Sequence, residues 1–197
     1  MRALTLATPE QRSFFTKVHP EYVRERAPGC EITMMVYHHT GGHYTGDWPI
    51  LTGQTGRWVS VHYYITRTGT IWHLTEDRLR ASHAGESIWQ GMTGPYGRSV
   101  NDISLGVEFE STGYNDYTEV QYEAGIWLAY QKMHEYDIAL DNIVGHKDVS
   151  PGRKWDPGLI ETAWFQADIV RYGNLLELQS ADTGITTQVT ADDLRTT

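Results

Sequence analysis

The order of apolar and polar residues along the chain predicts short strands interleaved with helices. Mostly apolar runs bounded by turn-forming residues are typical of buried strands. Such runs occupy residues 32–38, 59–66, 70–74, 103–110 and 143–146. Only Arg67-Thr68-Gly69 separates the second run from the third, which predicts a hairpin turn.

Two of these strands place polar side chains on a chosen face. By the period of two, Met34, Val36 and His38 share one face of their strand. In the run 103–110, Gly106, Glu108 and Glu110 lie opposite the apolar positions Leu105, Val107 and Phe109.

Capping signals and helical periodicity predict three helices. Thr8-Pro9-Glu10-Gln11 is a capping box with proline at the first helical position, and it predicts a short helix with Phe14, Phe15 and Val18. A second capping box, Thr118 to Gln121, precedes the apolar stripe Tyr122, Ile126, Ala129, Met133 and Tyr136. The last helix is marked by Ile160, Ala163, Ala167 and Val170, and the stretches 40–57 and 85–101 are expected to be loops.

Strands interleaved with helices indicate an α/β layered fold. A chain of 197 residues suits one domain with one sizeable core. Apolar content falls after Leu178, so we expect the domain over residues 1–178 and a polar tail over 179–197. A strand exchanged with a neighbouring subunit remains an alternative for the tail, and the oligomeric state is open.

Composition excludes several classes of partner. The formal net charge is −9 and no stripe of Lys and Arg is present, which argues against a nucleic-acid partner. No apolar run is long enough to predict a membrane span, and Cys30 is alone, so no intramolecular disulfide can form. The first residues lack the apolar region of a signal peptide, so we expect synthesis in the cytoplasm without one.

Three residues carry the pattern of a zinc site. His38 and His146 each end a predicted strand, and Asp156 follows ten residues later in GHKDVSPGRKWDPG. Two imidazoles and one carboxylate match the three-ligand zinc site of hydrolases, whose open position holds a water of lowered pKa. An isolated histidine is more often a hydrogen-bonded core residue, so the surrounding motifs have to decide.

Those motifs resemble the zinc-dependent N-acetylmuramoyl-L-alanine amidases, a family that includes phage endolysins and peptidoglycan recognition proteins. The matching segments, in family order, are MMVYHHTGG, WVSVHYYITRTGTIWHL, SHAG, NDISLGVEFES and VGHKDVSPGRKWDPG. The resemblance implies a central mixed β-sheet flanked by helices and one Zn²⁺ ion held by His38, His146 and Asp156. His39, the second member of the HH pair, would point to the opposite side of the strand.

The resemblance also implies catalytic and binding roles. Lys154 would stabilise the oxyanion of the attacked amide, and Glu108, with Glu110 as its rival, would take a proton from water and deliver it to the leaving nitrogen. His83 would line the substrate groove, and Asn101 would bind the peptide stem or cap a local turn. His62 is expected in the core or behind the site. Ser82 and Val61 stand where relatives carry Trp and Tyr.

The implied reaction is hydrolysis of the amide between N-acetylmuramic acid and L-alanine in peptidoglycan. A phage-type endolysin that acts on the cell wall after host lysis is the main interpretation. An intracellular recycling amidase for soluble anhydro-muropeptides and a non-catalytic peptidoglycan-binding module are the alternatives.

Overall fold

A mixed six-stranded sheet forms the centre of the protein. The computed structural model describes residues 4, 8–13, 23–93, 99–114 and 117–183. The strand order in the sheet is β1 (Gln11–Ser13), β5 (Ile71–His73), β4 (Tyr63–Ile65), β9 (Ser104–Phe109), β3 (Met34–His39) and β10 (Ile143–Gly145). Strands β4 and β5 pair antiparallel, while the other neighbours are parallel.

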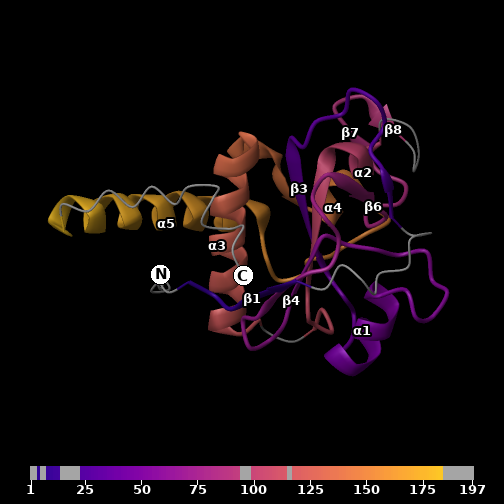
Figure 1. Cartoon of the computed structure of the whole chain (residues 1–197), viewed down its shortest axis with the longest axis horizontal. Coiled ribbons are helices and arrows are strands. Elements are labelled where there is room, and N and C mark those ends of the chain that lie inside the picture. Colours follow the sequence, from indigo (N-terminus) through magenta and orange to yellow (C-terminus); the bar gives the residue numbers. More distant parts are fainter. Residues whose placement is uncertain (1–3, 5–7, 14–22, 94–98, 115–116, 184–197) are drawn as a thin grey trace.

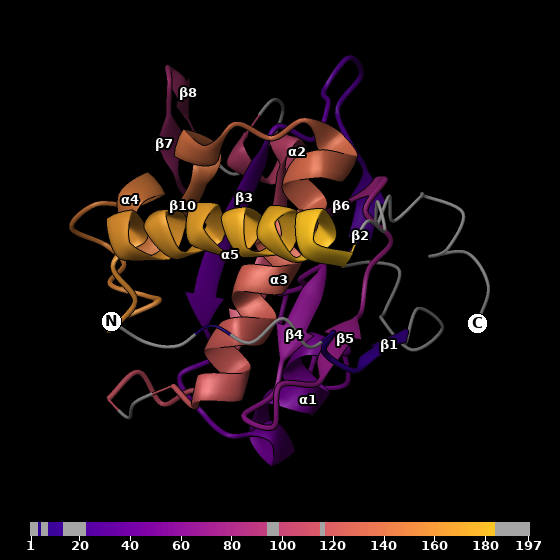
Figure 2. The same cartoon turned by 90° about the vertical axis from the view of Figure 1, so that its left-hand side faces the viewer.

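Helices cover both faces of this sheet. Helix α3 (Glu119–Tyr136) lies on one face, and α5 (Thr162–Thr183) crosses outside it, as the two views agree (Figures 1 and 2). Helices α1 (Tyr44–Leu51) and α2 (Val100–Ile103) lie on the other side in Figure 1. The short 3-10 helix η3 (Leu140–Asn142) comes directly before β10, and the short helix α4 (His146–Val149) comes directly after that strand. Two small sheets pair β2 (Val23–Glu25) with β6 (Leu79–Ala81) and β7 (Ile88–Trp89) with β8 (Met92–Thr93).

The alternation along β3 and β9 decides which side chains reach the site. The largest apolar cluster contains Met35, Tyr37, Leu105, Val107 and Phe109 together with residues of α3 and α5. Met34 and Val36 belong to a separate cluster on the opposite face. The faces predicted from the sequence are therefore confirmed, and His38 and Glu108 leave the sheet on the side away from α3.

The expected strands and the long helix are present, with shorter strands than predicted. The Thr118 side chain caps α3 by accepting a hydrogen bond from the Gln121 backbone N–H at 3.2 Å. Within the parts of the chain that the structure describes, every helix is too short or too polar to span a lipid bilayer.

Two of the loop and helix predictions at the front of the chain are wrong. Residues 11–13 form strand β1, which pairs with β5, in place of the predicted helix; residues 14–22, with the rest of that prediction, lie outside the described residues. The stretch 40–57 contains α1, although its glycines and Pro49 weaken the helical signal. Contacts of Leu51 and Trp48 with the third apolar cluster stabilise this helix through tertiary packing.

The other differences concern 85–101 and the last helix. The strands β7 and β8 and the start of α2 interrupt the expected second loop. In α5 the buried face is Phe165, Ile169 and Tyr172, whereas Ala163, Ala167 and Val170 are exposed. Phe165, Ile169 and Tyr172 belong to the largest apolar cluster, so packing against that cluster selects the buried face of the helix. The helix also continues to Thr183, past the predicted domain end at 178, while residues 184–197 lie outside the described residues.

Candidate metal centre

The candidate site lies where neighbouring parallel strands end. His38 is near the end of β3, and His146 comes directly after β10, the strand that pairs with β3. Asp156 follows on the loop after α4. Two hydrogen bonds hold that loop: the Lys147 backbone N–H donates to the Asp156 carbonyl at 2.9 Å, and the Tyr117 hydroxyl donates to the Pro157 carbonyl at 2.7 Å.

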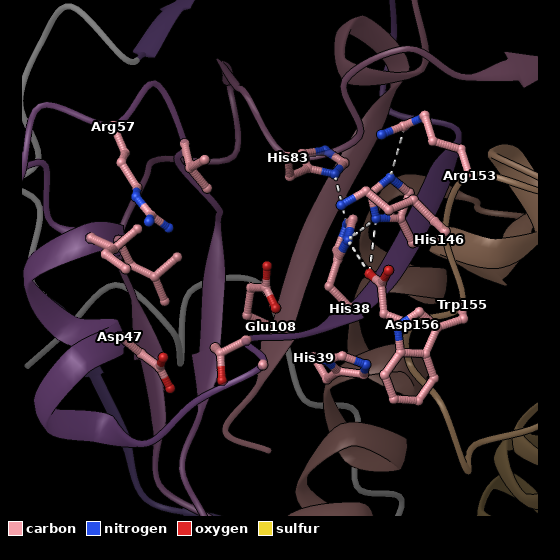
Figure 3. A pocket seen from close by; sticks show the side chains of 16 residues that line it. His38, His39, Asp47, Arg57, His83, Glu108, His146, Arg153, Trp155 and Asp156 are labelled. Atoms are coloured by element: carbon pink, nitrogen blue, oxygen red, sulfur yellow. Dashed lines mark hydrogen bonds and ion pairs between the residues drawn. The ribbon is translucent and has the colours of Figure 1, made fainter. Parts of the chain in front are cut away.

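Three potential metal ligands converge at this point (Figure 3). The distance between Nδ1 of His38 and Nδ1 of His146 is 2.9 Å. Oδ2 of Asp156 lies 3.1 Å from the first of these nitrogens and 2.8 Å from the second. All three residues are buried. The structure thus brings together the three ligands expected from the sequence.

A chain of hydrogen bonds assigns the proton of His38. The Ser104 hydroxyl donates to the Val100 carbonyl at 2.6 Å, so its oxygen accepts from Nε2–H of His83 at 3.1 Å. Nδ1 of His83 is then an acceptor, and it receives Nε2–H of His38 at 3.0 Å. Burial, together with the nearby His146, lowers the pKa of His38 to about 4, and burial lowers the pKa of His83 well below its usual value. Both rings are neutral at pH 7, and His38 presents a lone pair at Nδ1.

His146 is oriented in the same sense by the backbone. Its Nε2–H donates to the Ala84 carbonyl at 2.9 Å. Arg153 donates to the same carbonyl at 2.9 Å and to the Ser150 hydroxyl at 2.7 Å, which holds this wall of the site in place. Nδ1 of His146 is left facing Asp156 and His38.

The donor set fits a metal ion such as Zn²⁺. Two imidazole nitrogens and one carboxylate oxygen lie about 3 Å apart with their lone pairs directed at one another. A single proton can satisfy one of these contacts, whereas a cation satisfies all three. Nitrogen and oxygen ligands in this number are those of a catalytic zinc site with an open position.

The site opens into a cavity of about 430 Å³. Glu108 and Asp47 both line it, and each has one carboxylate oxygen without a hydrogen-bond partner among the described residues. Glu108 stands directly across from His38 in the register between β9 and β3. Burial raises the pKa of Glu108 well above its usual range, and the charges of Asp156 and Asp47 add to the shift. Burial also raises the pKa of Asp47.

Three cations line the same cavity in different settings. Arg153 is engaged with backbone carbonyls, as described above. Lys154 is exposed two residues before Asp156. Arg57 lies on the far wall above α1, and no hydrogen bond or ion pair joins its guanidinium to the described part of the chain (Figure 3).

The other predicted residues occupy distinct positions. His83 lines the cavity and contacts His38, and Gly106 leaves room for it, since a Cβ there would lie 2.4 Å from the imidazole. Asn101 is buried away from the cavity lining, where its Oδ1 accepts the backbone N–H groups of His83 and Ala84 at 3.2 and 2.9 Å. It therefore holds the segment that carries His83.

His39 and His62 complete the histidines near the site. His39 lines the cavity beside Trp155, at a ring distance of 4.6 Å, although strand alternation turns it away from His38. His62 is fully buried in the core: its Nδ1 accepts the Gly106 N–H at 2.9 Å and its Nε2–H donates to the Leu79 carbonyl at 3.0 Å. Glu110, the rival of Glu108, accepts backbone N–H groups of Tyr44 and Arg67 instead.

Sequence reasoning missed Asp47, Arg57, Ser104, Arg153 and Trp155. Asp47 and Arg57 fall in the stretch that was expected to be a loop. Arg153 and Trp155 flank Lys154 inside the most specific motif, so their place in that motif was an available signal. Nothing local distinguishes Ser104, because its role depends on contact with His83 across 21 positions of sequence.

Comparisons with known proteins point to one family. The sequence model of the family described as N-acetylmuramoyl-L-alanine amidase (Amidase_2) matches residues 28–159. The 1,6-anhydro-N-acetylmuramyl-L-alanine amidase AmpD of Enterobacter cloacae is 37% identical over 100 residues, which cover 51% of this chain and 51% of that protein. The chain spans about half the length of the curated relatives it matches.

Two solved structures share the fold. Escherichia coli AmiD, in complex with the substrate anhydro-N-acetylmuramic acid-L-Ala-D-gamma-Glu-L-Lys, is 30% identical with a TM-score of 0.62, and the match covers 76% of this chain and 61% of AmiD. The endolysin amidase LysCS from Clostridium intestinale is 21% identical with a TM-score of 0.60, over 83% of this chain and 97% of that one. The second likeness shows the fold alone.

Proposed function

Because the chain belongs to the N-acetylmuramoyl-L-alanine amidase family, we propose that it hydrolyses the amide between the lactyl group of muramic acid and L-alanine in soluble 1,6-anhydro-muropeptides. The observation that carries the activity is the convergence of three lone pairs from His38, His146 and Asp156 beside a cavity. A Zn²⁺ ion held there would supply Lewis acidity and a water of lowered pKa.

Glu108 is proposed to move the proton. Glu108 lines the cavity on the strand next to His38, and its buried Oε2 has no hydrogen-bond partner among the described residues. A carboxyl whose pKa is raised by burial is a stronger base than an ordinary carboxylate, and it can accept a proton from water and return it to the leaving nitrogen. Lys154, which lines the same cavity two residues before Asp156, is proposed to stabilise the negative charge that develops on the carbonyl oxygen.

The far wall suits the peptide part of the substrate. The ligand named for AmiD contains a γ-linked glutamate, which leaves one carboxylate of that residue free. Arg57 lies on the wall away from the metal ligands, and its guanidinium has no partner in the part of the chain that the structure describes. Guanidinium groups bind carboxylates in bidentate fashion. We assign the stem peptide to this wall.

The substrate class corresponds to the recycling amidase that was an alternative from the sequence. The relatives named AmpD and AmiD support it over a phage-type endolysin, because the likeness to an endolysin lies at 21% identity. No observation on this chain specifically favours the endolysin function, so it is not proposed as a second candidate.

The test compares substrates on the zinc-loaded protein. Anhydro-N-acetylmuramyl-L-Ala-D-γ-Glu-L-Lys and intact sacculi are each incubated with enzyme, and released peptide is identified by mass spectrometry. We expect hydrolysis of the soluble compound to be faster by about tenfold or more. Faster release from sacculi would favour the endolysin, and tight zinc binding without hydrolysis of either would indicate a recognition module.

Glu108→Gln is the matched control for the chemistry. The amide keeps the size of the side chain but cannot take up the proton. Turnover should fall by at least about 100-fold while zinc content stays the same. Unchanged turnover would remove Glu108 from the reaction.

A further inference from the structure

We propose that Trp155 and Tyr114 form an aromatic platform that stacks against the sugar ring of the muropeptide, an inference that rests on the proposed function. Trp155 lines the cavity and is the chain neighbour of Asp156, yet its side chain is 47% exposed. Tyr114 is 88% exposed, and its ring centroid lies 5.3 Å from that of Trp155.

The indole is held in place from behind. The His39 ring packs against it edge-on, with a centroid distance of 4.6 Å and an interplanar angle of 66°. Gly113 and Gly158 complete the support, because a Cβ at these positions would lie 2.5 and 3.2 Å from atoms of the indole. Both glycines have positive φ, +81° and +64°, which side chains rarely adopt. The ring is therefore oriented before any ligand arrives.

A fixed and exposed aromatic ring at the mouth of a site is a binding surface. Large aromatic side chains offer contact area at small cost in conformational entropy, and flat ring systems stack on them. The C–H faces of a sugar ring are apolar, while its hydroxyl edge stays in water. A pyranose or its anhydro form thus matches the aromatic platform, which is flat, apolar and half open to solvent.

The position of the metal ligands separates the two parts of the substrate. The scissile amide has to lie at the converging lone pairs of His38, His146 and Asp156, with sugar on one side and peptide on the other. Arg57 provides charge on the far wall, and Trp155 lies beside Asp156 on the near wall (Figure 3). Arg57 matches the carboxylate of the peptide, and Trp155 matches the apolar face of the sugar.

The competing occupant of this platform is an apolar or cationic part of the stem peptide, which an aromatic face can also bind. Two substrates distinguish the occupants. One is anhydro-N-acetylmuramyl-L-Ala-D-γ-Glu-L-Lys, and the other is D-lactyl-L-Ala-D-γ-Glu-L-Lys, which keeps the amide and the peptide but lacks the sugar ring.

Kinetics on Trp155→Ala, Trp155→Phe and Tyr114→Ala test the platform. For Trp155→Ala we expect kcat/KM on the sugar-containing substrate to fall about tenfold and kcat/KM on the lactyl substrate to stay within about twofold. Tyr114→Ala should give a smaller selective loss, and Trp155→Phe should restore most of the activity. Zinc content is measured in each variant, because Trp155 adjoins Asp156. Trp164→Ala, an exposed tryptophan on α5, is the control and should change neither substrate.

Equal loss on both substrates, or no loss on either, would overturn the platform. Binding of 1,6-anhydro-N-acetylmuramic acid alone, measured by isothermal titration, separates this proposal from the proposed function. If the wild-type protein binds the sugar more tightly than Trp155→Ala does but hydrolyses neither substrate, the platform stands and the hydrolase assignment fails. If it hydrolyses both substrates and the variant shows no selective loss, only the platform fails.

Discussion

Two buried polar clusters of this protein each combine an aspartate with histidine, but their hydrogen-bonding groups are satisfied differently. The convergent cluster comprises His38, His83, His146 and Asp156. The paired cluster comprises Asp77 with His73, Lys132, Tyr63 and Tyr136. The central sheet contributes to both, with His38 on β3 and Tyr63 on β4. Each cluster has a carboxylate that contacts at least one imidazole.

In the paired cluster every contact joins a donor to an acceptor. Oδ1 of Asp77 accepts from the Tyr63 hydroxyl at 2.7 Å and from His73 Nε2–H at 3.0 Å. Oδ2 accepts from Lys132 at 2.7 Å and from the Tyr136 hydroxyl at 3.0 Å. Burial raises the pKa of Asp77, but the hydrogen bond from His73 and the charge of Lys132 outweigh it, so the pKa lies well below its usual value. This cluster is complete within the protein.

In the convergent cluster the protons point outward. The relay through His83 and Ser104 takes the proton of His38 to the far side of its ring, and the Ala84 carbonyl does the same for His146. Three lone pairs are left facing one another. The comparison shows that a buried contact between a carboxylate and an imidazole does not by itself mark a candidate metal site, and that the direction of the protons separates the two clusters.

The largest expected effect comes from removing one of the converging lone pairs. His146→Ala should weaken zinc binding by more than about 100-fold, beyond what is typical of losing a partner behind a ligand, and hydrolysis should be lost with it. Isothermal titration with Zn²⁺ measures the affinity. Chelation of the wild-type protein should also stop hydrolysis, and added Zn²⁺ should restore it.

His62→Asn is the matched control for that experiment, since His62 is equally buried but makes its hydrogen bonds within the core. Its zinc affinity should remain within about twofold of the wild type. Similar zinc affinity in His146→Ala and the wild type would show that the convergent cluster is not a metal site.

The opposite result is expected when the paired cluster is broken. Lys132→Met leaves the Asp77 charge buried without its cation, and such a loss costs about 3–5 kcal/mol. Urea unfolding of the metal-free protein should show this loss, whereas zinc affinity should not change. Lys147→Met, which removes an ion pair with the half-exposed Glu161, should cost less than about 1 kcal/mol. Equal costs for the two variants would contradict the distinction drawn between the clusters.

The sequence predicts the arrangements that depend on neighbouring residues better than those that depend on contacts between residues far apart in the chain. The faces of β3 and β9 follow from local alternation, so His38 and Glu108 could be assigned to the side away from α3. The register that puts His38 opposite Glu108 depends on strand pairing and could not be read from either strand alone. The metal ligands were instead predicted from the order of the family motifs along the chain, which does not require knowledge of the strand pairing.

The failures have the same cause. Helix α1 is stabilised by contacts of Leu51 with Val61, Tyr64 and Leu74, and a sequence with Gly46 and Pro49 gives little local sign of it. In α5 two apolar stripes compete, and only the packing against α3 selects Phe165, Ile169 and Tyr172. The two hydrogen bonds that Asn101 accepts from the backbone of His83 and Ala84 are likewise tertiary contacts.

A smaller effect is expected at the end of the relay. Ser104→Ala removes the acceptor for Nε2–H of His83, which frees that ring to carry its proton on Nδ1 and to push the proton of His38 toward the metal position. Zinc affinity should fall by about 10- to 100-fold, as is typical of partners behind a ligand. Ser87→Ala is the control, because its hydroxyl also donates to a backbone carbonyl but contacts no imidazole. Equal zinc affinity of Ser104→Ala and the wild type would mean that the relay does not set the tautomer of His38.

The smallest effect concerns the pH dependence of stability that arises from His62, a buried histidine outside both clusters. Burial, together with the charge of Arg26, lowers the pKa of His62 from 6.5 to about 3, so the folded protein binds fewer protons there than the unfolded chain between these values. Stability from this group is present above pH 6.5 and is lost as pH falls toward 3. Between pH 7 and pH 5 the loss is at most about 2 kcal/mol. In His62→Gln the free energy of unfolding, measured by urea titration of metal-free protein, should depend less steeply on pH over this range. Since His38 and His146 remain in both proteins, the difference isolates His62, and an unchanged slope would show that its proton is not excluded by the core.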